Sequence, residues 1–109
     1  MKNWRILEVE NEIFRRRRNE WIEQVSDSFG AGHTNDIFVC ECGDPDCSEK
    51  ISMTRAEYEA VRSVGSRFVV AINHENPEIE RVTFENGSFA IVQKMMAAGR
   101  MSQEMNPRR

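Results

Sequence analysis

Three cysteines close together limit what this chain can fold into more than any other feature of its sequence. Cys40, Cys42 and Cys47 are the only cysteines present, and their spacing is C-x-C-x4-C. If residues 38–42 are extended, alternate side chains lie on one face, so Cys40 and Cys42 present both thiols to the same side. Residues 43–46, Gly-Asp-Pro-Asp, are typical of a turn that folds Cys47 back toward that pair. The sequence therefore predicts three thiols that converge at a tight turn.

A histidine is the best candidate for a fourth ligand. His74 follows the apolar run at residues 68–72, and it reaches the thiols if that strand neighbours the cysteine strand. His33, in a glycine-containing loop, is the rival ligand. The alternative for His74 is a satisfied or exposed histidine beside Glu75. Three soft thiolates and one imidazole suit zinc, in a closed and therefore structural site. The predicted ligands are Cys40, Cys42, Cys47 and His74.

The cellular setting favours metal over disulfides. A chain of 109 residues is one domain, near the size at which a metal ion helps stability. No apolar run is long enough to span a membrane, and the first residues lack the apolar segment of a secretion signal. We therefore expect a cytoplasmic protein, where clustered cysteines more often bind metal than pair. Redox-active thiols and plain buried cysteines are the alternatives.

The N-terminal part, residues 1–29, is predicted to be an amphipathic helical segment. Its helix spans about residues 3–29, with Asn3 as the cap and Gly30 as the stop. The main apolar stripe consists of Trp4, Leu7, Phe14, Trp21 and Val25. This stripe either packs on the domain's own sheet or binds a partner, which includes a second copy of the chain. A weaker second stripe, Ile6, Val9 and Ile13, is interpreted as a face for another partner.

Residues 30–94 are predicted to form a zinc-binding α+β domain, and 95–109 a flexible tail or a segment that orders on a partner. Thr54 and Glu57 form a capping box for a short helix. A strand is expected over residues 67–74, with alternate side chains leading to the histidine. The fold class is therefore α+β, with a long N-terminal helix, a small antiparallel sheet, a C-terminal hairpin and one short helix, pinned by the Cys3His site.

The hairpin is expected over residues 81–94. Asn86-Gly87 is a strong signal for a two-residue loop, which would pair Phe84 with Phe89. That register places one apolar face in the core, made of Val82, Phe84, Phe89 and Ile91.

Residues 38 to about 94 resemble a set of small uncharacterised bacterial proteins. The shared motifs are an F-x-C-E-C-x4-C knuckle, an A-E-Y-E-x-V helix at residues 56–61, and a strand that ends in His-Glu at residues 74–75. Members often have glycine before the histidine, where this chain has Asn73. The resemblance implies a metal-binding domain and brings no activity with it.

Two functions compete with a protein-interaction role. The consecutive Arg15, Arg16, Arg17 and Arg18 suggest nucleic-acid contact, although on a helix they spread around the axis. Acidic residues around the knuckle, Glu41 among them, would repel phosphate. A thiol-based redox or zinc sensor is the other alternative. No nucleophile–base pair, phosphate loop or H-E-x-x-H motif indicates an enzyme. We therefore expect a non-enzymatic, zinc-stabilised domain for protein interaction or regulation.

Overall fold

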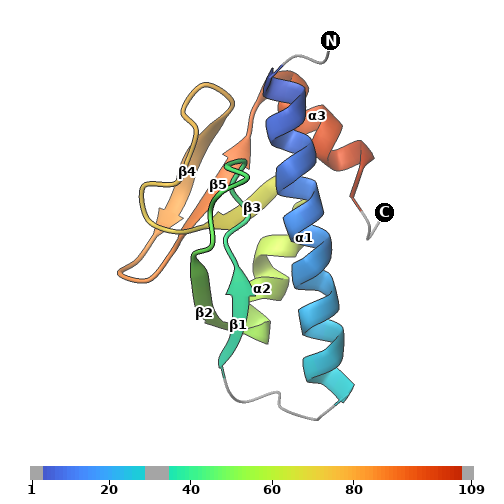
Figure 1. The fold of residues 1–109 in the computed structure, drawn as a ribbon, viewed down its shortest axis with the longest axis vertical. Helices are drawn as coiled ribbons and strands as arrows, with labels where there is room; N and C mark the ends of the chain where they lie inside the picture. The colour runs from blue at the N-terminus through green and yellow to red at the C-terminus, as the bar shows by residue number, and fades with distance from the viewer. Residues whose placement is uncertain (1–3, 29–34, 107–109) are drawn as a thin grey trace.

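The computed structural model describes residues 4–28 and 35–106. It confirms the predicted α+β class: a long helix lies along one side of two small antiparallel sheets (Figure 1). The elements in chain order are α1 (Trp4–Ser28), β1 (Asn35–Val39), β2 (Lys50–Thr54), α2 (Arg55–Arg62), β3 (Arg67–Val70), β4 (Glu80–Glu85), β5 (Ala90–Lys94) and α3 (Met96–Glu104). Among these residues, no helix combines the length and the apolar composition needed to cross a bilayer.

The strands form two sheets where one was expected. β1 pairs with β2, and the second sheet has the order β3-β5-β4. The segment that follows β1 connects them, because the Glu41 N–H donates to the Val69 carbonyl at 2.8 Å. The cysteine segment therefore lies beside β3, as the prediction of His74 as a ligand required. The two segments share this backbone hydrogen bond but do not form a regular strand ladder.

Helix α1 faces the core with two of the three residues of the stripe that we had assigned to another partner, whereas the third, Ile6, is 41% exposed. Val9 and Ile13 are almost completely buried, which corrects that assignment. The stripe of Leu7, Phe14 and Trp21 lies on the opposite side of the helix and is 45%, 69% and 63% exposed. The physical reason is that polar residues with partners in the body of the protein complete the inward face.

Helix α2 begins as its sequence predicts. The Thr54 hydroxyl accepts the Glu57 N–H at 3.1 Å, and the Glu57 carboxylate accepts the Thr54 N–H at 2.8 Å. These two bonds satisfy donors that a helix start leaves without partners. Tyr58 is then fully buried, and its ring stacks on Phe38 with 4.5 Å between the centroids. The helix is thereby fixed against the strand that leads into the knuckle.

The β4–β5 hairpin has a different register from the expected one. Phe84 pairs with Ile91 instead of Phe89, and the ladder is irregular between Val82 and Phe84. The Asn86 side chain causes this, since its oxygen accepts the backbone N–H of Phe89 at 2.9 Å and closes a longer loop. Val82 and Phe84 remain 37% and 50% exposed, so the predicted core face is wrong for these two residues.

The expected flexible tail is in part a helix. α3 packs against α1 near its N-terminal end (Figure 1). Ser102 is completely buried, and Met101 and Met105 pack against the hydrophobic core. Methionine side chains fill irregular gaps well, which explains why a methionine-rich segment orders on this body.

Candidate metal centre

The four side chains predicted as ligands lie together. The ligand atoms of Cys40, Cys42, Cys47 and His74 are all within 4.8 Å of one another. The His74 Nδ1 atom is 3.7 Å from the Cys40 sulfur and 3.5 Å from the Cys47 sulfur. This cluster can hold a metal ion. The rival ligand, His33, lies outside the described residues.

Two turns bring the ligands to one point. The Cys47 N–H donates to the Asp44 carbonyl at 3.1 Å, which closes the expected turn between the second and third cysteines. On the other side, β3 ends at Val70, so the strand expected over residues 67–74 is too long. A turn presents His74 instead, and its N–H donates to the Ala71 carbonyl at 3.0 Å. Asn73 has φ 69°, in the left-handed region that favours glycine and tolerates asparagine.

The thiols have donors that favour their charged form. The Ala71 N–H donates to the Cys40 sulfur at 3.2 Å, and Arg15 Nη1 lies 3.7 Å from the Cys42 sulfur. The pKa of Cys42 is lowered to about 4. The main cause is the hydrogen bond between the Cys40 thiol and the Cys42 sulfur, and a hydrogen bond to the His74 ring adds to it. The same bond to Cys42, together with burial, raises the pKa of Cys40. One thiol of the Cys40–Cys42 pair therefore loses its proton readily, and a bound cation would help to remove the others.

Polar residues at four-residue intervals along α1 form hydrogen bonds to the cysteine knuckle, residues 38–47. Asn11 donates to the Gly43 carbonyl at 3.3 Å, and Arg15 donates to the Cys40 and Asp44 carbonyls at 3.2 and 2.6 Å. One turn further, Asn19 both donates to the Val39 carbonyl and accepts its N–H. This row was not predicted from the sequence. Its signal was asparagine and arginine at helical spacing on the side adjoining the apolar face.

Glu41, between the first two cysteines, points into the protein. It is fully buried, and its carboxylate accepts from Asn19 Nδ2 at 2.8 Å, from the Tyr58 hydroxyl at 2.8 Å and from the Val69 N–H at 3.0 Å. We had counted it among the acidic residues around the knuckle that would repel phosphate, but its buried carboxylate does not face an approaching phosphate. One buried carboxylate thus ties α1, α2 and β3 together beneath the cluster.

The four consecutive arginines have three different environments. Arg15 holds the knuckle, whereas Arg16 is completely buried, with its guanidinium 3.5 Å from the centre of the Phe68 ring. Burial lowers the pKa of Arg16 to about 10. Arg17 and Arg18 are exposed. Arg16 was one of four residues named as possible nucleic-acid contacts, and its burial leaves it no surface for one.

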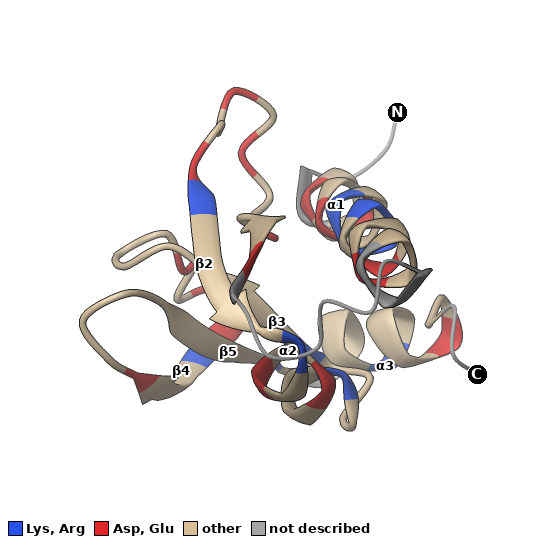
Figure 2. Cartoon of the chain, turned by 90° about the horizontal axis from the view of Figure 1, so that it is seen from below, with Lys and Arg blue, Asp and Glu red and all other residues tan. Residues whose placement is uncertain are grey.

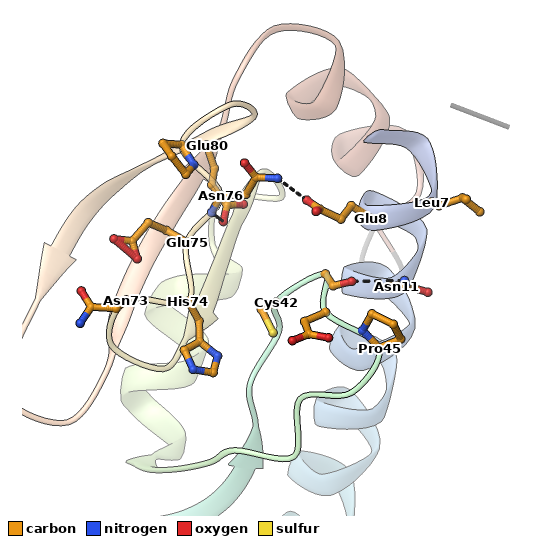
Figure 3. Close-up of a pocket in the computed structure, with 13 residues that line it drawn as sticks. Leu7, Glu8, Asn11, Cys42, Pro45, Asn73, His74, Glu75, Asn76 and Glu80 are labelled. Carbon is orange, nitrogen blue, oxygen red and sulfur yellow. Dashed lines mark hydrogen bonds between the residues drawn. The ribbon is translucent and has the colours of Figure 1, made fainter. Parts of the chain in front are cut away.

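An open cleft of about 650 Å³ adjoins the cluster. Figure 3 shows the Cys42 sulfur and the His74 ring near one another at this cleft, with a hydrogen bond between Asn76 and Glu8 beyond them. That bond joins Asn76 Nδ2 to Glu8 Oε2 at 2.6 Å. The charged residues in its wall are Glu8, Asp44, Glu75 and Glu80 together with the His74 ring, so the charge of the cleft is mainly acidic.

Glycine is required at the point where the knuckle meets α1. A methyl group at Gly43 would overlap Glu8 Cγ and lie 3.0 Å from Glu8 Cβ, close to the helix backbone. We expect Gly43→Ala to lower the free energy of unfolding by about 1–3 kcal/mol, because α1 must move away. Urea denaturation measures this. Gly87→Ala is the matched control, since nothing lies within 4 Å of its added methyl group, and an equal loss in both variants would contradict the argument.

Comparisons of the chain with family models, with curated proteins and with solved structures found no match.

Proposed function

We propose that the cluster binds Zn²⁺ in a closed, structural site. Zinc bonds of about 2.3 Å to sulfur and about 2.0–2.1 Å to nitrogen imply sulfur–nitrogen separations of roughly 3.6 Å in a tetrahedral site. The separations of 3.7 and 3.5 Å from His74 Nδ1 to the Cys40 and Cys47 sulfurs fit this value. Four protein ligands leave no position for a reactive water, which supports a non-enzymatic role.

The proposed function is to present the outer face of α1 to another polypeptide. We define the outer face as Leu7, Phe14 and Trp21. The observation that carries the proposal is their exposure of 45%, 69% and 63%, on a helix whose other side is fixed to the body of the protein. Large aromatic side chains on a rigid element are typical of interface anchors. The metal would hold the knuckle to which Asn11 and Arg15 bind, and so would help to keep α1 in place.

Nucleic-acid binding has less support. Burial of Arg16 and the contacts of Arg15 leave Arg17 and Arg18 as the exposed members of the arginine run. Two exposed cations beside large apolar side chains match a protein partner better than a phosphate backbone.

Site-specific photo-crosslinking tests the proposed function. We expect a photo-reactive phenylalanine analogue at Phe14, in cells that express the chain, to give a discrete adduct with another polypeptide. The same analogue at Phe84, which is 50% exposed on the hairpin, is the matched control and should give none. Trp21→Glu should remove the Phe14 adduct, because it places a charge in the same face. Equal adducts from both positions would contradict the proposal.

Metal affinity should depend on Arg15. In Arg15→Ala the charge beside Cys42 and the bonds to the Cys40 and Asp44 carbonyls are lost. We expect Zn²⁺ affinity to fall by about 10–100-fold, as for other residues that support metal ligands. Competition with a chromophoric chelator measures it. The control is Arg17→Ala on the exposed side of the same helix, and unchanged affinity in both variants would show that Arg15 does not support the site.

A further inference from the structure

We propose that the outer face of α1 binds a second copy of this chain, with the two helices antiparallel and centred on Phe14. This rests on the proposed function and names its partner. Figure 2 shows that, within the described part of the chain, the sheets and α3 lie to one side of α1 and its opposite side is open. A helix face with two large exposed aromatic side chains is typical of a surface that binds another polypeptide of complementary shape and charge.

The three apolar residues form one row along α1. Leu7, Phe14 and Trp21 are seven residues apart, so each lies two turns beyond the last and only about 20° around the helix. An antiparallel copy centred on Phe14 places Phe14 against its equivalent and Leu7 against Trp21 of the partner chain. Both ends of the row are then covered by an apolar side chain. In a parallel pair the two bulky tryptophans would meet at one end and the two leucines at the other.

The charges beside the row favour the antiparallel arrangement. Glu10 and Arg17 lie on the same flank, one before and one after Phe14. With a rise of about 1.5 Å per residue, two-fold symmetry places Glu10 within about 1.5 Å, along the axis, of Arg17 of the partner chain. It also separates the two Arg17 residues by about 9 Å along the axis. A parallel pair would bring opposite flanks together and set Arg17 beside Arg18 of the partner chain, which costs free energy through like-charge repulsion.

The size of the contact sets the expected strength. α1 has 25 residues and is therefore about 37 Å long. One helix on each side gives an interface at the low end of the range for specific complexes. We therefore expect a dimer whose population depends on protein concentration.

Sedimentation equilibrium of the full metal-loaded chain tests the proposal. The wild type should be a concentration-dependent dimer, and Phe14→Glu should weaken dimerisation at least roughly 30-fold, as loss of a central anchor does. Phe84→Glu is the control for an exposed aromatic residue elsewhere, and it should dimerise like the wild type. Circular dichroism shows whether each variant is folded, and loss of dimer in both variants would overturn the assignment to α1.

Charge exchange tests the orientation. Glu10→Arg and Arg17→Glu should each weaken the dimer several-fold, and the double variant should restore it. Tighter dimerisation of Arg17→Glu alone would indicate the parallel pair and overturn the proposed geometry. A monomeric wild type that still gives a Phe14 adduct with another polypeptide would overturn self-association and leave the proposed function intact. A monomer without an adduct would overturn both.

Discussion

Replacing Cys47 by serine is expected to remove most of the stability that the metal gives the protein, while barely changing the metal-free form. Cys47 is the half-buried cysteine of the cluster, so exchange of its thiol for a hydroxyl costs little in packing. Its sulfur nevertheless lies 3.5 Å from His74 Nδ1, where both can bind one ion. Loss of a thiolate ligand should reduce Zn²⁺ affinity by far more than the loss of a supporting residue.

The expected loss of unfolding free energy in Cys47→Ser follows from mass action. An ion present at about 1,000 times its dissociation constant stabilises the folded state by about 4 kcal/mol. We expect Cys47→Ser to lose at least about 3 kcal/mol of unfolding free energy in the presence of Zn²⁺. Denaturation of wild type and variant, with Zn²⁺ and with chelator, gives the four values required.

The four values also separate a metal site from an ordinary core contact. With chelator present, wild type and variant should unfold within about 0.5 kcal/mol of each other, as expected for a conservative change outside the core. An equal loss with and without Zn²⁺ would mean that Cys47 acts through packing. Unchanged wild-type stability on addition of Zn²⁺ would show that the cluster holds no structural ion.

The features predicted correctly from the sequence were those determined by residues close together in the chain. The turn that returns Cys47 depends on residues 43–46, and the start of α2 depends on Thr54 and Glu57. The place of His74 was also found, because it follows an apolar strand. The predicted hairpin register was wrong because a single side chain, Asn86, extends the loop. The longer loop and the two-residue turn are close in free energy, so the sequence alone does not decide between them.

The features that were missed depend on partners far away in the sequence. Periodicity alone gives the apolar positions of α1, and by that measure the stripe with Leu7, Phe14 and Trp21 was a candidate for the core while the weaker stripe was assigned to another partner. The inward face is decided by polar residues whose partners lie elsewhere: Asn19 binds Glu41, and Glu12 binds Lys94. A charged residue inside a helix is normally read as exposed. Only the fold shows that these charges have buried partners.

Lys94 is the centre of a buried charge group. It is 2% exposed and forms ion pairs with both Glu12 and Glu80, which are also buried. We expect Lys94→Met to lower the free energy of unfolding by about 3–5 kcal/mol at neutral pH, because two carboxylates lose their cation in a dry environment. Denaturation with urea measures this. Lys50→Met, on the exposed side of β2, is the control and should change stability by less than about 0.5 kcal/mol.

The loss should depend on pH in a direction that identifies its cause. Burial raises the pKa of Glu12 from its ordinary 4.5 to about 7, even though Lys94 acts to lower it. Without Lys94 the pKa of Glu12 in the folded protein must rise further, while its value in the unfolded chain stays the same. The folded state then binds the proton more readily than the unfolded chain. The free energy of unfolding of the variant therefore falls as the pH rises from the ordinary pKa of 4.5 to the raised pKa of Glu12 in the folded variant. Relative to the wild type, the deficit of Lys94→Met should therefore be larger at about pH 8 than at about pH 6. A deficit that is constant or grows as the pH is lowered would mean that lost packing against Phe68, and not the unpaired carboxylates, destabilises the variant.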